Sequence, residues 1–220
     1  MLPFGACESH GAHLPLGTDS FVTQKVAEEI AKAFNGYLLP LFPFGTSEEH
    51  IKFRGTVSLR HSTLAAVLQD IVESLEKTGF RKLIIVSFHG GNYILSSDFL
   101  KILQSRHPSL QIVFCEIRDA WRAALKNASI ETKDLHAGEV ETSLILALRP
   151  ELVKESVGDF PVTDESFKNI AVDHTGFPCD VSSVSERGVL GCPSKASRQK
   201  GELFFAKLLE ILIAQLKVSI

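Results

Sequence analysis

The stretch Lys82-Leu83-Ile84-Ile85-Val86-Ser87-Phe88 is an almost unbroken apolar run, and the turn His89-Gly90-Gly91-Asn92 follows it directly. A short apolar run without polar alternation is typical of a strand that is buried on both faces, as in a parallel sheet. The two glycines let the backbone turn sharply where the run ends. This stretch therefore predicts a central parallel strand, and it favours an α/β fold if helices flank it.

Helical and strand patterns alternate on both sides of this run, as an α/β fold requires. Helical periodicity covers five segments, which are 21–34, 62–77, 93–105, 139–147 and 195–218. Further strands are predicted at 37–41 and 111–116, and 151–193 is expected to be an irregular arm with one or two short strands. This order predicts one domain over residues 1–220, built as a three-layer α/β/α sandwich around a mostly parallel sheet.

Composition and charge exclude several classes of protein. The 220 residues are 45% hydrophobic and 22% charged, which is typical of a globular domain. The formal net charge of -3 argues against nucleic acid as a partner, because phosphate binding requires clustered Lys and Arg. We find no apolar run of membrane-spanning length and no signal peptide, so no membrane partner is expected. The four cysteines form no C-x-x-C pair, which predicts reduced thiols in a cytoplasmic protein.

The first polar loop contains two carboxylates and two imidazoles within twelve residues, namely Glu8, His10, His13 and Asp19. Imidazole and carboxylate together are the ligand chemistry of a divalent metal, and a carboxylate can bridge two ions. Cys7 lies in the same loop and could be a soft ligand, although a free cysteine packs in the core more often. The loop therefore predicts a metal site.

Two more polar loops follow, and each of them also precedes a predicted helix. His89 would project from the end of the central strand, although an isolated His-Gly-Gly-Asn is equally compatible with a plain strand-end turn. The third loop contains His136, Glu139 and Glu141, and either glutamate alone could be an acidic residue favoured at a helix start. Ligands of parallel sheets bind where strands end, so we expect the three loops to form one site.

The three loops in this order resemble the motifs of the creatininase family of metal-dependent amidohydrolases. The likeness extends to two further segments and covers nearly the whole chain. The stretches that resemble the family are 8–19 (ESHGAHLPLGTD), 55–59 (GTVSL), 89–92 (HGGN), 136–143 (HAGEVETS) and 194–202 (SKASRQKGE).

The resemblance implies hydrolysis of C–N bonds in a cyclic or linear amide at a centre of two divalent ions, which could be Zn, Mn or Fe. The metal ligands that it implies are Glu8, His10, Asp19 as the bridge, and His89. The founding creatininases have a glutamate where this chain has Gly91, and we predict that Glu141 fills that vacancy. His136 matches the family's proton-donating histidine. Glu139 is the other catalytic candidate, because it could orient that histidine or contact the substrate.

The predicted substrate-binding residues are His13, Asn92 and Arg54. Arg54 stands where the family usually has proline, and it could reach an anionic substrate or be plain surface. The tryptophan that closes the creatininase pocket has no counterpart that can be placed, since Trp121 is the only tryptophan of the chain. The Gly91 departure argues against creatinine itself as the small-molecule substrate.

The resemblance also implies a homo-oligomer, often a hexamer. A different class of function stays open, in which the chain is a metal-binding maturation or scaffold protein that acts on a peptide or pathway intermediate with little hydrolase activity of its own. A nucleotide-binding Rossmann protein is disfavoured, because no G-x-G-x-x-G follows the first strand.

Overall fold

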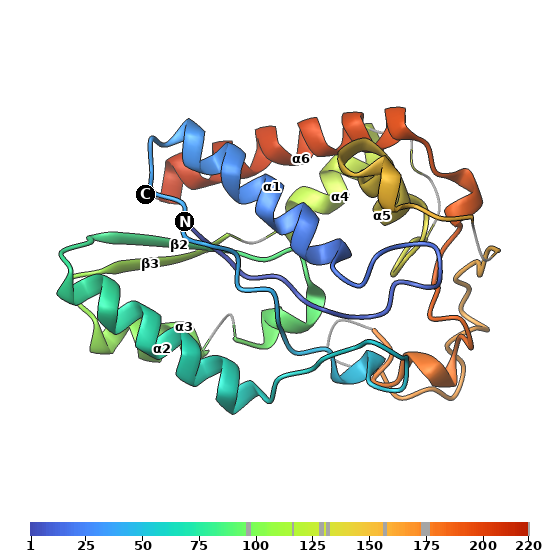
Figure 1. The fold of residues 1–220 in the computed structure, drawn as a ribbon, viewed down its shortest axis with the longest axis horizontal. Helices are drawn as coiled ribbons and strands as arrows, with labels where there is room; N and C mark the ends of the chain where they lie inside the picture. Colours follow the sequence, from blue (N-terminus) through green and yellow to red (C-terminus); the bar gives the residue numbers. More distant parts are fainter. Residues whose placement is uncertain are drawn as a thin grey trace.

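Three parallel strands form the centre of the computed structural model (Figure 1). They are β1 (Leu2–Pro3), β2 (Lys82–Val86) and β3 (Gln111–Cys115), in the order β1-β2-β3. The register pairs Ile85 of β2 with Leu2 on one side and with Phe114 on the other. The apolar run is therefore the central strand, as predicted. The structure describes residues 1–95, 98–115, 117–127, 130, 133–155, 158–172 and 177–219.

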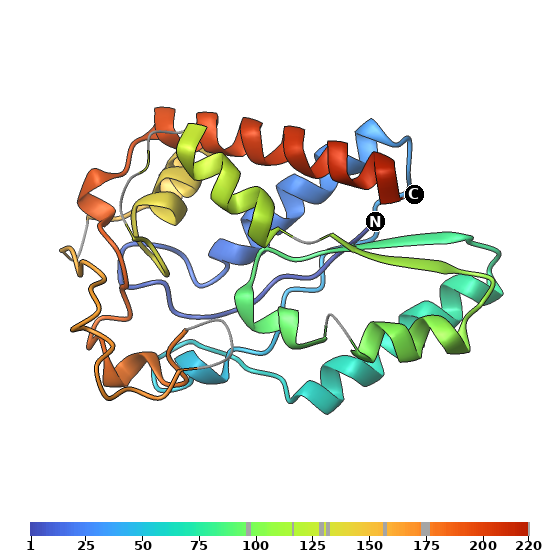
Figure 2. The ribbon, with the colours of Figure 1, turned by 180° about the vertical axis from the view of Figure 1, so that it is seen from behind.

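Helices cover both faces of this sheet, which confirms the three-layer α/β/α sandwich (Figures 1 and 2). One layer contains α1 (Thr18–Ala33), α4 (Arg118–Asn127), α5 (Glu139–Leu148) and α6 (Arg198–Ser219). The opposite layer contains α2 (His61–Lys77) and α3 (Asp98–Arg106). The chain ends lie close together at one end of the molecule, away from the loops that follow the strands (Figure 1).

Alternate residues of β2 enter two different hydrophobic cores. Ile84 and Val86 pack in the core under α1, α5 and α6, whereas Leu83 and Ile85 pack in the core over α2 and α3. All four side chains are at most 4% exposed. Both faces of the strand are thus dry, which is why its sequence shows no polar alternation.

The strand predicted at 37–41 is wrong. This segment does run beside β1, because Leu39 donates its N–H to the Met1 carbonyl and Phe42 donates to the Pro3 carbonyl. The only bridge there is the isolated parallel pair of Phe4 and Phe42. Pro40 and Pro43 lack the N–H groups that a regular ladder needs, so the pairing does not propagate.

The predicted helices are found with shifted ends. The helix expected at 93–105 is a 3-10 turn, η2 (Gly90–Leu95), followed by α3, and residues 96–97 lie outside the described residues. The strand expected at 111–116 is β3, whose predicted last residue Glu116 also lies outside them. Helix α4 was not predicted.

The arm at 151–193 lies at the end of the molecule to which the strands point (Figure 1). Its described part, which excludes 156–157 and 173–176, contains no strand but only isolated bridges, such as Phe160 to Gly191 and Val172 to Pro178. The one or two short strands expected there are therefore reduced to single bridges. Short 3-10 turns complete the arm, namely η3 (Pro150–Leu152), η4 (Val181–Ser183) and η5 (Pro193–Lys195).

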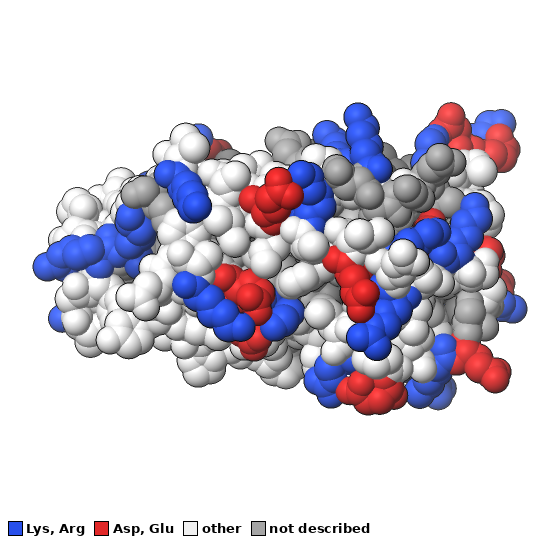
Figure 3. All heavy atoms as spheres, turned by 90° about the horizontal axis from the view of Figure 1, so that it is seen from above, with Lys and Arg blue, Asp and Glu red and all other residues white. Residues whose placement is uncertain are grey.

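The outer face of the helical layer has mixed charge. Figure 3 shows basic and acidic side chains interspersed over the middle of this face. Charged residues of this layer form ion pairs within single helices, such as Lys25 with Glu29 in α1 and Arg198 with Glu202 in α6, each at 2.8 Å. Among the described residues, no helix combines the length and the apolar character that crossing a bilayer requires.

Candidate metal centre

The loop between β1 and α1 brings three of the predicted ligands together. Glu8 and His10 come from the loop itself, and Asp19 comes from the first turn of α1. Their exposed fractions are 1%, 0% and 2%. The loop is fixed by a backbone hydrogen bond from the Glu8 N–H to the Leu16 carbonyl at 2.9 Å. Three ionisable side chains are thus buried side by side at the carboxyl end of the sheet.

The carboxylate of Asp19 faces two histidines from different loops. Its Oδ1 lies 3.6 Å from Nε2 of His10, and its Oδ2 lies 3.4 Å from Nδ1 of His89. Glu141 approaches the first histidine, with Oε2 3.8 Å from Nε2 of His10. Glu8 approaches the second, with Oε2 3.4 Å from Nε2 of His89. Asp19 therefore lies between the pair of His10 and Glu141 and the pair of His89 and Glu8.

These side chains fit a divalent metal. Ligand atoms from His10, Asp19 and Glu141 lie within 4.8 Å of one another, as do ligand atoms from Glu8, Glu49 and His89. Two ligands that are each about 2.1 Å from a tetrahedral ion lie about 3.4 Å apart, close to the separations found here. Glu8 Oε2, His10 Nε2 and Asp19 Oδ2 are buried without a hydrogen-bond partner. Buried charged groups without partners are costly, so this arrangement favours a bound cation.

The protonation of the cluster reflects burial and mutual attraction. Burial raises the pKa of Glu8 to about 8, against the attraction of His89. The pKa of Asp19 is nevertheless lowered well below its usual value, because the attraction of His10 and His89 outweighs burial. The pKa of His10 is raised in the same way by Asp19 and Glu141. Asp19 therefore stays an anion between two imidazoles.

His89 is held in one orientation by the segment before η1 (Glu48–His50). Its Nε2 lies 2.6 Å from the carbonyl oxygen of Thr46. This contact fixes the ring so that Nδ1 faces Asp19 and Nε2 also faces Glu8. The next predicted residue, Asn92, is 3% exposed and bonds to Gly5, Ser87 and Thr46. It ties loops together and is not among the described residues that line the cavity.

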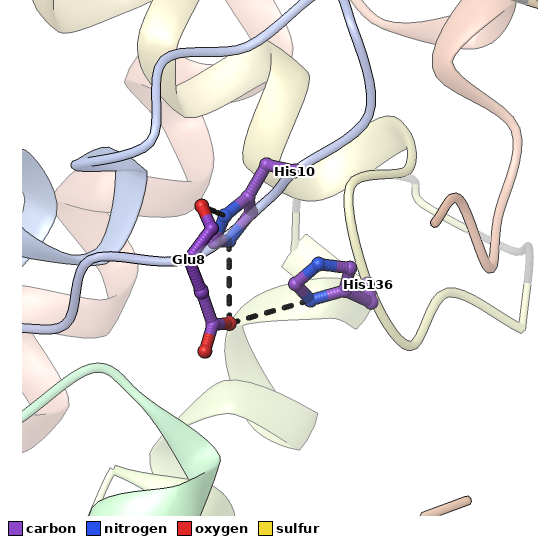
Figure 4. Close-up of side chains that lie close together, drawn as sticks. All are labelled: Glu8, His10 and His136. Carbon is purple, nitrogen blue, oxygen red and sulfur yellow. Dashed lines mark hydrogen bonds and ion pairs between the residues drawn. The ribbon is translucent and has the colours of Figure 1, made fainter. Parts of the chain in front are cut away.

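The loop before α5 places His136 against Glu8. Its Nδ1 lies 3.8 Å from Oε1 of Glu8, and Nε2 lies 2.8 Å from the Ser9 carbonyl oxygen. Figure 4 shows the imidazoles of His10 and His136 converging on that carboxylate. Burial, followed by the nearby His10, lowers the pKa of His136 to about 4. The ring is therefore neutral at pH 7, with its proton on the nitrogen that faces Ser9.

The two glutamates of α5 point in different directions. Glu141 turns toward the metal positions and accepts a hydrogen bond from the Ala137 N–H. Glu139 is 1% exposed and forms an ion pair with Lys200 of α6. Asp134 caps the start of α5 by accepting the N–H groups of Glu139 and Val140, at 2.9 and 2.7 Å. Glu139, predicted as catalytic, is thus placed in the contact between helices and not among the described cavity-lining residues.

Two predicted substrate-binding residues also lie away from the cavity. His13 is fully buried, and its Nε2 lies 3.0 Å from the Thr142 hydroxyl. Arg54 is exposed and is not among the described residues that line the cavity. Neither position tests a role in substrate binding, so the roles of His13 and Arg54 stay predictions.

A cavity of about 410 Å³ opens onto the predicted ligands Glu8, Asp19, His89 and Glu141 and onto His136. Sequence reasoning missed several residues of its wall, which are Glu48, Glu49, His50, Phe88, Ile117, Trp121, Arg122 and Phe177. His50 stacks on His136 with ring centroids 4.0 Å apart, and its Nε2 lies 3.7 Å from Oε1 of Glu8. The dense polar triplet 48–50 was a signal that could have found three of these residues.

The sequence also matches a known protein family over nearly its whole length. The profile of the creatininase family, described as creatinine amidohydrolase, matches residues 1–216. The chain belongs to the creatininase family. As a family member it is a hydrolase of carbon–nitrogen bonds.

Curated relatives of this creatininase-family chain include a creatinine amidohydrolase and a peptide peptidase. The creatinine amidohydrolase of Pseudomonas putida is 30% identical over 92% of this chain and 82% of its own length. The mycofactocin precursor peptide peptidase of Mycolicibacterium smegmatis is 31% identical over 94% of this chain and 80% of its own length.

Solved structures of creatininase share the fold. A mutant creatininase of the Zn–Zn type superposes with a TM-score of 0.82 at 23% identity, covering 100% of this chain and 89% of that one. The manganese form gives a TM-score of 0.78 at 25% identity, covering 100% and 90%.

Proposed function

We propose that this creatininase-family protein hydrolyses the C–N bond of a cyclic or linear amide at a centre of two divalent ions. The observation that supports two positions is the Asp19 carboxylate, whose two oxygens face His10 and His89 separately. Glu141 completes one position and Glu8 the other. We also infer that residues 1–220 form one domain, since strand β2 contributes to both cores.

The identity of the ions follows from ligand chemistry. Mixed imidazole and carboxylate ligands accept Zn, Mn or Fe. Solved creatininases of a Zn–Zn type and with Mn make the first two the leading candidates. When bound, such ions lower the pKa of a water and polarise a carbonyl oxygen.

The protein's own part in the proposed reaction is proton transfer and positioning. His136 is neutral at pH 7, and its Nδ1 lies 3.8 Å from Oε1 of Glu8 while the Ser9 carbonyl holds the opposite N–H. Nδ1 can therefore accept the proton of the attacking water and then give it to the leaving nitrogen. His50, stacked on this ring, keeps it in place and shields it from solvent.

The cavity wall indicates a small substrate with an apolar or planar part. Phe88 and Trp121 lie side by side with ring centroids 5.1 Å apart, and Phe177 and Arg122 line the same space. Aromatic walls bind flat groups through offset contacts. Because Gly91 replaces the glutamate expected from the founding creatininases, we propose an amide other than creatinine.

A second candidate is peptide processing. The identity to the mycofactocin precursor peptide peptidase equals that to the creatinine amidohydrolase within one percentage point. A maturation protein of this kind would act on a peptide or pathway intermediate and show little turnover on small amides. Turnover that appears only when a peptide or partner protein is added would favour this candidate.

The test is an amide panel with metal-reconstituted protein. Creatinine, an N-formylated amine, a linear amide and a short peptide would be incubated with the protein, and release of amine or ammonia would be measured. The His136→Ala variant is the control, because it keeps the predicted ligands. Turnover of creatinine, the N-formylated amine or the linear amide by the wild type, absent in the variant, supports the proposal, whereas turnover of the peptide alone favours the second candidate. Equal release by both proteins would contradict it.

The homo-oligomer implied by the family stays a prediction, and sedimentation velocity checks it. A species of several times 24.2 kDa is expected. A monomer at micromolar concentration would contradict it.

A further inference from the structure

We propose that Glu49 is a ligand of the metal position formed by Glu8 and His89. This inference rests on the metal centre proposed above and adds a residue from a separate segment to it. Glu49 belongs to η1 (Glu48–His50), which lies far in sequence from both partners.

The geometry places its carboxylate beside the other two ligands. Oε1 of Glu49 lies 4.0 Å from Nε2 of His89, and one ligand atom from each of Glu8, Glu49 and His89 lies within 4.8 Å of the other two. Oε2 of Glu8 is buried without a hydrogen-bond partner and faces the same space. A buried oxygen that lacks a partner beside two more ligand atoms indicates a cation at this position.

Gly91 explains why the carboxylate comes from this segment. A Cβ atom at Gly91 would lie 2.1 Å from the Thr46 carbonyl oxygen and 2.6 Å from Nε2 of His89. It would also lie 3.2 Å from Oε1 of Glu49. The segment before η1 therefore fills the space that a side chain at position 91 would need. Glu49 reaches that space instead.

Glu141 does not take this place. The structure groups Glu141 with His10 and Asp19, at the other position. The missing side chain at position 91 is thus next to Glu49, while Glu141 lies beside His10 at the other proposed metal position.

Hydrogen bonds hold the two segments together as one unit. The Thr46 hydroxyl donates to the Gly91 carbonyl at 2.7 Å, and the Thr46 N–H donates to Oδ1 of Asn92 at 3.2 Å. The Thr46 carbonyl in turn contacts His89. Three contacts from one residue fix Glu49 relative to the His-Gly-Gly-Asn loop, as a metal ligand requires.

The adjacent Glu48 provides a matched control. Glu48 has the same charge and lines the same cavity, but its residue is exposed, whereas the Glu49 side chain is 18% exposed. No candidate metal group among the described residues includes Glu48. A general effect of acidic charge would appear in both variants, and a ligand effect only in one.

The experiment compares full-length wild type, Glu49→Gln and Glu48→Gln. Each protein would be stripped of metal, titrated with Zn or Mn by calorimetry, and measured by plasma mass spectrometry after dialysis. Thermal unfolding of the stripped proteins would verify that both variants fold. Glu49→Gln is expected to retain one ion and bind the second at least about 100-fold more weakly, beyond the usual effect of outer-shell residues.

The possible results separate the two claims. Wild-type stoichiometry and affinity in Glu49→Gln would overturn the ligand role of Glu49 and leave the proposed function intact. A wild type that binds no ion would instead contradict the metal centre itself. Equal losses in Glu49→Gln and Glu48→Gln would also overturn the inference, because they would show a nonspecific charge effect. As a further check, Glu49→Asp should bind the second ion with intermediate affinity.

Discussion

The contact between α5 and α6 at Gly201 can be tested through stability. A Cβ atom added at Gly201 would lie 1.9 Å from the carbonyl oxygen of Ser143 and 2.4 Å from its carbonyl carbon. These are backbone atoms of α5, the helix that presents Glu141, so no side-chain rotation can relieve the overlap. Gly201→Ala must therefore push the two helices apart.

The magnitude follows from that overlap. An ordinary C···O contact is about 3.3 Å, so the helices must separate by about 1.4 Å. Overpacking of this kind costs about 3 kcal/mol, the upper part of its usual range. The gain of about 1 kcal/mol from replacing glycine in a helix offsets part of this cost. The expected net loss is about 2 kcal/mol, which lowers Tm by about 4–8 °C in a chain of this size.

The assay is thermal and urea unfolding followed by circular dichroism, with metal-free protein throughout. Gly36→Ala is the matched control, because Gly36 is exposed and a Cβ there meets no atom within 4 Å. Its Tm should change by no more than about 1–2 °C, as expected for an open surface site. A Gly201→Ala protein as stable as the wild type would refute the reasoning on helix contact.

Three further predictions concern the site and its support. His136→Ala should keep its bound metal but lose about two to four orders of magnitude in kcat, because proton transfer is removed. Steady-state kinetics together with metal analysis checks this, and an unchanged kcat would remove His136 from the mechanism. Lys200→Met should cost about 3 kcal/mol in urea unfolding, since it removes the ion pair between Lys200 and the buried Glu139 carboxylate. Lys200→Met with Glu139→Gln should regain most of that loss, and an unaffected single variant would contradict the contribution of this ion pair. Metal at about 100 times its Kd should stabilise the protein by about 2.7 kcal/mol, and chelation should therefore lower Tm by about 5–11 °C. A Tm that changes with neither chelator nor added metal would contradict metal binding to the native state.

Sequence patterns predicted what depends on local periodicity. The alternating burial of Leu83, Ile84, Ile85 and Val86 follows directly from their apolar run. The strand at 37–41 failed because Pro40 and Pro43 interrupt the ladder, although its residues are apolar enough. The missing backbone N–H groups, and not the hydrophobicity of the segment, prevent it from forming a strand.

Site residues were predictable where they lie in recognisable motifs, and missed where tertiary contacts bring them in. Glu49 and His50 lie in a polar turn without periodicity, and the bonds of Thr46 to the His-Gly-Gly-Asn loop bring that turn to the site. The family resemblance assigned Glu141 to the metal and Glu139 to catalysis, but no local pattern showed that Glu139 would face α6. Residues two apart on a helix point to different faces, and only the position of Lys200 shows which one faces α6.

The most direct test of the central claim is the metal content of untagged protein purified without chelator, measured by plasma mass spectrometry beside Asp19→Asn. The two carboxylate oxygens of Asp19 lie 3.6 Å from His10 and 3.4 Å from His89, one histidine of each proposed position. About two divalent ions per chain in the wild type, both lost or greatly weakened in Asp19→Asn, is the expected result. No ion in the wild type, even after reconstitution with Zn, Mn and Fe, or full occupancy in Asp19→Asn, would contradict it.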